Sequence, residues 1–168
     1  MALRKVTFND SPVRAADHGA LFAGIISDGI VNGCNMSVSN GEVSFGAGYF
    51  IVAGRLIENN SDDFSINVRG NNIAQIVLAL DISDDDADIN EMLDVRGAAD
   101  INSLAPLTKT DINDGRHYEY EFEIAVINVT NNTIVRQMPL ASRPIRVLDS
   151  IPESWSTYPD GIYLIKES

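Results

Sequence analysis

The chain has 168 residues with a hydrophobic fraction of 45%, which suits one domain with a normal core. Its 24 acidic residues against 12 basic ones give a net charge of −12, so we expect no nucleic-acid partner. No apolar run approaches the ~18 residues that a membrane helix needs, and we expect no membrane partner.

The first elements predicted along the chain are a short strand over residues 3–8 and one helix over residues 17–27. Asp17 is a candidate N-cap, and Ser11 followed by Pro12 is an earlier alternative. Leu21 and Phe22 each have an isoleucine four residues later, which predicts one apolar helix face. Gly29 is the expected stop, because glycine tolerates the left-handed conformation after a last helical turn.

Strand and turn signals replace helical ones from residue 32 onward. Asn40-Gly41 is a strong two-residue hairpin signal between two alternating segments. Gly46 and Gly48 predict a bend or bulge beside Tyr49. The run over residues 73–82 is rich in Ile, Val and Leu, which favours a buried central strand. The strands predicted in this half cover residues 36–38, 43–45, 49–52, 55–58, 64–68 and 73–82.

The second half predicts a strand or helical turn at 92–95, a linker at 98–115 and a long strand at 118–129. In that strand Tyr118, Tyr120, Phe122 and Ile124 face one side, while Glu119, Glu121 and Glu123 face the other. A turn follows, then strands at 133–135 and 162–165. The expected fold is a β-dominated α+β protein, an antiparallel sheet or sandwich with one N-terminal helix. We expect a structural domain over 1–147 and an extended C-terminal arm over 148–168.

The acidic run at residues 84–88 is the strongest apparent metal site. Asp84, Asp86, Asp88 and Asn90 alternate like the first half of a calcium loop. The pattern then fails, because Ile89 stands where the loop needs glycine and the twelfth position is not Glu. We therefore predict a solvated loop, no metal site and no cofactor.

The single cysteine, Cys34, excludes an intrachain disulfide and fits assembly in a reducing cytoplasm. A nucleophilic Cys34 with His117 as its base is conceivable, but no sequence signature supports it. A buried or incidental thiol is the favoured interpretation. His18 and His117 have no partner at metal-ligand spacing. No catalytic residue is predicted.

The C-terminal aromatics Trp155, Tyr158 and Tyr163 lie in a segment that also contains several prolines. Aromatic residues dominate subunit interfaces, so an interface is the favoured interpretation. Stacking on sugar rings is the alternative, both for these residues and for Tyr118, Tyr120 and Phe122. The two interpretations remain open at this point.

Several segments in a fixed order resemble bacteriophage tail and baseplate structural proteins. They are ISDGIV, GAGYFIVAGRLIEN, IAQIVLALD, and LTKTDINDG directly before YEYEFEIAVINV. The resemblance covers residues 17 to about 147. It implies a β-rich adaptor at the tail tip, of the kind that often leads into longer fibres. No long fibre or sizeable receptor-binding segment is found within the 168 residues, which favours an adaptor.

The resemblance implies a non-enzymatic virion structural protein of a phage or prophage tail or baseplate, assembled in the host cytoplasm. The expected partners are other tail or baseplate proteins and further copies of this chain. A trimer is the expected homo-oligomer, with the C-terminal arm packed on an adjacent subunit. The alternative function is a carbohydrate-binding, receptor-recognising module that uses the C-terminal aromatics. An enzyme using Cys34 or the acidic run is a third, weaker option.

Overall fold

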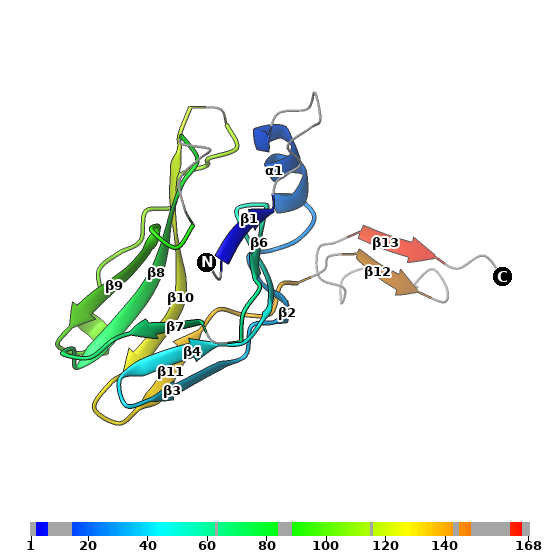
Figure 1. Cartoon of the computed structure of the whole chain (residues 1–168). Coiled ribbons are helices and arrows are strands. Elements are labelled where there is room, and N and C mark those ends of the chain that lie inside the picture. The colour runs from blue at the N-terminus through cyan, green and yellow to red at the C-terminus, as the bar shows by residue number, and fades with distance from the viewer. Residues whose placement is uncertain are drawn as a thin grey trace.

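The computed structural model describes residues 3–6, 15–62, 64–83, 89–114, 116–142, 145–148 and 162–165, with the backbone alone at 3–6, 15–18, 145–148 and 162–165. These residues form β-sheets whose strands pair mainly in antiparallel fashion, together with one short N-terminal helix (Figure 1). This confirms the predicted fold class. The elements are β1 (Leu3–Val6), α1 (Ala15–Ala23), β2 (Gly29–Gly33), β3 (Met36–Ser39), β4 (Glu42–Phe45), β5 (Gly48–Val52), β6 (Arg55–Asn59), β7 (Phe64–Asn67), β8 (Ile73–Asp81), β9 (Leu93–Ala98), the 3-10 helix η1 (Ile101–Ser103), β10 (Glu119–Asn128), β11 (Thr133–Gln137), β12 (Ile145–Leu148) and β13 (Ile162–Ile165).

The first half of the chain is a meander of three long, bent strands. Each consists of two elements in succession: β2 with β3, β4 with β5, and β6 with β7. The turn at Asn40-Gly41 has positive φ at both residues, 52° and 71°, as the tightest hairpin turns require. Ala53-Gly54 repeats this geometry at the other end, with φ of 48° and 76°. The hairpin predicted from Asn40-Gly41 is confirmed.

A corner divides this meander into two sheets, β1-β6-β5-β2 (the first sheet) and β3-β4-β7. Gly33 and Gly48 are register partners at the corner. A Cβ atom on Gly33 would lie 2.2 Å from the carbonyl oxygen of Ala47, so only glycine permits this close approach. The Asn59 amide donates to the carbonyl oxygens of Phe45 and Gly46, at 3.2 and 2.9 Å. The bend predicted beside Tyr49 is confirmed.

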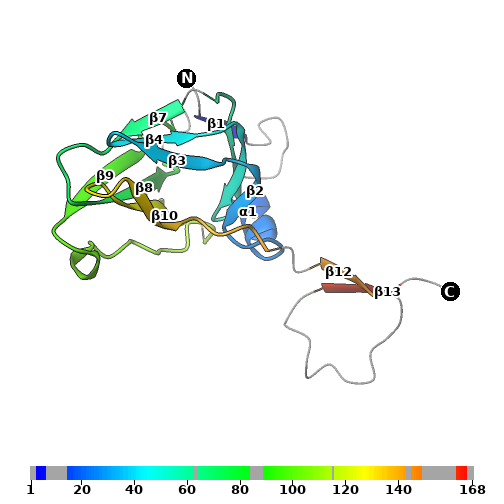
Figure 2. The same ribbon diagram turned by 90° about the horizontal axis from the view of Figure 1, so that it is seen from below.

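Strands β8 to β11 form a four-stranded antiparallel sheet (the second sheet) in the order β11-β10-β8-β9. Its strand β8 pairs with a neighbour on each side, which confirms the predicted buried central strand. Sheet β3-β4-β7 packs over the second sheet, and these two sheets are the layers of a sandwich (Figure 2). The core between the layers includes Val43, Phe45, Ile76, Leu78, Leu80, Phe122 and Ile127.

The helix differs from its prediction at both ends. It begins at Ala15, so Asp17 lies inside it, and it ends at Ala23 rather than at residue 27. The residues after Gly24 leave the helix because the chain must enter β2, whose first residue is Gly29. The predicted apolar face is also partly wrong, because Leu21 is 57% exposed. Gly19 is buried instead, where α1 touches the Ala53-Gly54 turn at the end of the first sheet.

The segment predicted as a linker at 98–115 packs on the second sheet. The amide of Glu121 donates to the carbonyl oxygen of Thr108 at 2.8 Å. The backbones of Lys109 and Tyr120 form an isolated antiparallel β-bridge. Ile112 is only 1% exposed and belongs to the core. The segment therefore continues the sheet edge beside the first half of β10.

A crossing segment at residues 138–142 joins the first sheet to the second. The Met138 amide donates to the Ile124 carbonyl at 2.8 Å, in the second sheet. The chain then runs parallel to β2, where Ile30 donates to Pro139 and accepts from Ala141, at 2.8 and 2.7 Å. The crossing segment thus covers the free edge of β2 and connects the first sheet to the second.

After the crossing segment, β12 and β13 form a separate parallel pair. The strand predicted at 162–165 is confirmed as β13, whereas β12 was missed. The boundary expected between residues 147 and 148 falls inside β12.

Candidate functional site

The structure places the predicted site residues in different regions. Trp155 and Tyr158 lie outside the described residues, and Tyr163 lies in β13, where only the backbone is described. The acidic run at 84–88 also lies outside them. Within the described part of the chain, no group of three or more His, Cys, Asp or Glu residues could hold a metal ion.

Cys34 is buried at the corner between β2 and β3, with 1% of its surface exposed. Burial raises the pKa of its thiol to about 11, so the protonated form dominates at neutral pH. A small cavity of about 10 Å³ adjoins it, lined mostly by apolar residues such as Phe45, Phe50 and Met138. His117 is not among the lining residues. The favoured interpretation of Cys34 as a buried thiol is confirmed.

A polar groove opens where β8 ends and β10 begins. Its volume is about 310 Å³. This is within the range of small-molecule sites. The amide of Ile82 donates to the carbonyl of Tyr118 at 2.9 Å and holds the two chain segments together there. The groove is lined by Asp81, Ser83, Thr108, Thr110, Arg116, His117, Tyr118 and Glu119.

Within the groove, Tyr118 is half-exposed and His117 is fixed by Asp114. His117 Nδ1 lies 2.7 Å from Asp114 Oδ2. The amides of Arg116 and His117 donate to the same carboxylate, and these hydrogen bonds hold the pKa of Asp114 below its usual value. The groove therefore offers an aromatic ring next to charged and hydroxyl groups. The sequence offered Tyr118 as a residue that could stack on a sugar, but it did not reveal the groove, because the lining residues come from separate segments of the chain.

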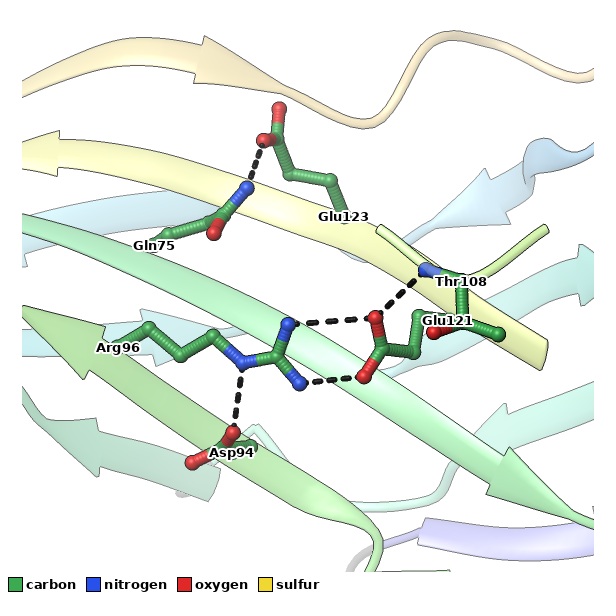
Figure 3. Close-up of polar contacts among 6 residues, drawn as sticks. All are labelled: Gln75, Asp94, Arg96, Thr108, Glu121 and Glu123. Carbon is green, nitrogen blue, oxygen red and sulfur yellow. Dashed lines mark hydrogen bonds and ion pairs between the residues drawn. The ribbon is translucent and has the colours of Figure 1, made fainter. Parts of the chain in front are cut away.

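The outer face of the second sheet carries a network of charged residues (Figure 3). Arg96 in β9 reaches across β8 to Glu121 in β10, with Nη1–Oε2 and Nη2–Oε1 distances of 3.2 and 2.5 Å. Asp94 accepts from Arg96 Nε at 2.8 Å, and the Thr108 amide donates to Glu121 at 2.7 Å. Hydrogen bonds from Arg96, then from Thr108, lower the pKa of Glu121 to about 2.

Glu123 forms a second cluster on the same face of the sheet (Figure 3). It accepts from Gln75 Nε2 at 2.8 Å and from two nitrogens of Arg136 in β11. Burial alone would raise the pKa of Glu123, but the hydrogen bonds from Arg136 and Gln75 outweigh it and lower the pKa. The alternation of the glutamates predicted their shared face. Their arginine partners come from other strands, so the sequence pattern did not reveal them.

A third polar cluster joins the two sheets at Asp28. Its Oδ1 accepts from the Ala53 amide at 2.6 Å, in the first sheet, and its Oδ2 accepts from the Tyr120 hydroxyl at 2.8 Å, in the second. Lys109 Nζ lies 3.1 Å from the same hydroxyl and 4.2 Å from the centre of the Tyr120 ring. Burial, and then the hydrogen bond to Asp28, raise the pKa of Tyr120. The cluster has the geometry of a structural clamp.

No known family model matches this sequence, and no curated protein matches it either. Among the described residues, no helix has the length and apolar character needed to cross a membrane.

Proposed function

We propose that this chain is a non-enzymatic structural protein of a phage or prophage tail or baseplate. In this proposal it acts as an adaptor in virion assembly, in contact with other tail or baseplate proteins and with further copies of itself. It would be assembled in the host cytoplasm and carried in the virion. The segments that resemble tail proteins support the proposal, because they contain residues that connect the first sheet to the two layers of the sandwich.

One observation carries most of the weight: a cross-tied sandwich is followed by a strand pair that stands apart from it. ISDGIV contributes the Asp28 clamp and β2, while GAGYFIVAGRLIEN contributes the corner and the β5–β6 hairpin. A body with several internal ties and a separate C-terminal element suits a connector, which must keep its shape while it contacts neighbours.

The adaptor proposal is tested on purified particles. Antibodies raised against the protein should label one end of the tail in electron micrographs of phage or induced prophage particles from the source strain. Mass spectrometry of the same particles should detect its peptides at a constant ratio to a major tail protein. Absence of the protein from particles that are otherwise complete would contradict the proposal.

Carbohydrate binding is the second candidate, and the groove beside Tyr118 is the observation that favours it. An exposed aromatic ring next to Arg116, His117 and Glu119 can stack on a sugar and hydrogen-bond its hydroxyl groups. A glycan array should then show binding that Tyr118→Ala abolishes. Trp155→Ala serves as the comparison, since the sequence alone pointed to Trp155. Wild-type protein that binds no glycan would reject this candidate.

A further inference from the structure

The C-terminal strand pair is incomplete as a folding unit. β12 and β13 pair in parallel, with Ile145 opposite Ile162 and Leu148 opposite Ile165. Both views show the pair apart from the sandwich layers (Figures 1 and 2). Parallel strands occur almost only in sheets that are covered on both faces, and an isolated two-stranded unit is marginal in water. Each strand also has one edge that no other described strand pairs.

The register divides the eight positions into two faces of different character. Alternation places Ile145, Val147, Ile162 and Leu164 on one face, which is entirely aliphatic. Arg146 and Tyr163 share the other face with Leu148 and Ile165. This is the pattern of a strand pair with an apolar side to bury and a mixed side to expose.

The charge distribution indicates what covers the aliphatic face. Residues 1–142 contain 20 acidic and nine basic residues, a net charge of −11. Residues 143–168 contain four acidic and three basic residues, a net charge of −1. The acidic bodies of several copies repel one another, whereas their nearly neutral C-terminal segments can come together. The same unit on another copy offers a matching aliphatic face and matching free edges.

We propose that the strand pairs of three copies join edge to edge into a closed parallel ring, with β13 of one copy beside β12 of the next. The free edges of β12 and β13 differ, so the contact is head-to-tail, and repeated head-to-tail contacts that close produce a ring. An axis along the strands keeps all six strands parallel and puts the aliphatic face inside. The inference rests on the homo-oligomer proposed above and specifies its interface; it does not require that the protein sits in a tail.

Two adjacent positions in β12 provide a matched pair of variants. Val147→Glu places a charge on the aliphatic face, and Arg146→Glu changes the mixed face of the same strand. Light scattering should give wild type and Arg146→Glu about three times the chain mass of 18.3 kDa, and Val147→Glu the mass of one chain. Circular dichroism and the melting temperature of the sandwich should be the same for all three. A Val147→Glu protein that keeps the wild-type mass would overturn the ring.

Cysteine cross-linking tests which strands meet. In a Cys34→Ser background, Val147→Cys chains and Leu164→Cys chains that carry tags of different mass are mixed, unfolded, refolded and oxidised. The ring predicts disulfides between the two kinds of chain, and none between two chains of the same kind. Disulfides within one kind would show two-fold pairing of β12 with β12, or of β13 with β13, and would overturn the proposal. An oligomer without any such cross-link would locate the interface elsewhere, which rejects the ring and leaves the proposed homo-oligomer standing.

Discussion

At the scale of single residues, Glu121 links the charged face of the second sheet to the pH dependence of stability. Its carboxylate accepts from Arg96 and from the Thr108 amide. These contacts lower its pKa from the ordinary 4.5 to about 2. Because the folded pKa lies below the unfolded one, the stabilisation is fully present above about pH 5 and is lost as the pH falls toward 2.

We predict that Glu121→Gln lowers the free energy of unfolding by about 1–3 kcal/mol at pH 7, because the neutral amide loses a charge-assisted pair. The difference from wild type should shrink steadily between pH 5 and pH 2. Urea unfolding followed by circular dichroism across this range measures it. Glu119→Gln, an exposed change on the same strand, is the control. A deficit that does not change with pH would show that the ion pair is not its cause.

Replacing Gly33 and replacing Gly70 distinguish the cost of backbone strain from the cost of a steric clash. Both have positive φ, 60° and 88°, but a Cβ on Gly33 would lie 2.2 Å from the Ala47 carbonyl oxygen, whereas a Cβ on Gly70 meets nothing within 4 Å. Gly70→Ala should cost about 1 kcal/mol from backbone strain alone. Gly33→Ala should cost clearly more, since it also forces the corner apart. Thermal unfolding of both variants checks this, and equal melting temperatures would contradict the corner argument.

At the scale of elements, the Asp28 clamp couples the first sheet to the second. Asp28→Asn and Tyr120→Phe each remove part of one hydrogen-bonded chain, so their effects should not add. We predict a coupling free energy of about 1–2 kcal/mol in a double-mutant cycle measured by urea unfolding. The Thr133→Ala and Glu119→Gln pair, on separate strands, should show additive effects. Additive effects of Asp28→Asn and Tyr120→Phe would mean that the clamp contributes nothing as a unit.

Local patterns predicted most strands but not the connections between them. Asn40-Gly41, the alternation through Tyr120 and Phe122, and the apolar run over β8 carry their signals within a few residues. β2 was missed because Gly29 fits both a helix stop and a strand start. β12 was missed because its four residues, just after Pro144, can be recognised as a strand only through their pairing with β13. The groove and the charged network bring together residues from separate strands, so no local pattern reveals them.

At the scale of the whole molecule, the body and the C-terminal strands should be separable. The ties of the body end with the crossing segment, where Ser142 bonds Ser27 through its amide and its hydroxyl, both at 2.8 Å. We predict that a chain ending at Ser142 keeps the circular dichroism spectrum and, within about two degrees, the melting temperature of the full-length protein. Its mass by light scattering should fall to that of one chain. A truncated chain that still assembles would place the interface on the body.

Calcium provides a further test of the whole molecule, because the acidic run lacks the glycine and the glutamate of a calcium loop. We predict that millimolar calcium shifts the melting temperature by no more than about one or two degrees. Magnesium at the same concentration controls for general screening of the charge of −12. A large shift that calcium alone produces would demonstrate a selective site in the folded protein.

The crossing segment also has a mechanical consequence. A force that pulls on β12 enters the body through residues 138–142, which lie between the two sheets. The first bonds under load are those of Ser142 with Ser27 and of Ala141 and Pro139 with Ile30. Because this segment runs parallel to β2, tension along it loads these bonds together in shear instead of opening them one at a time. The molecule therefore resists traction at the point where its body gives way to the C-terminal strands.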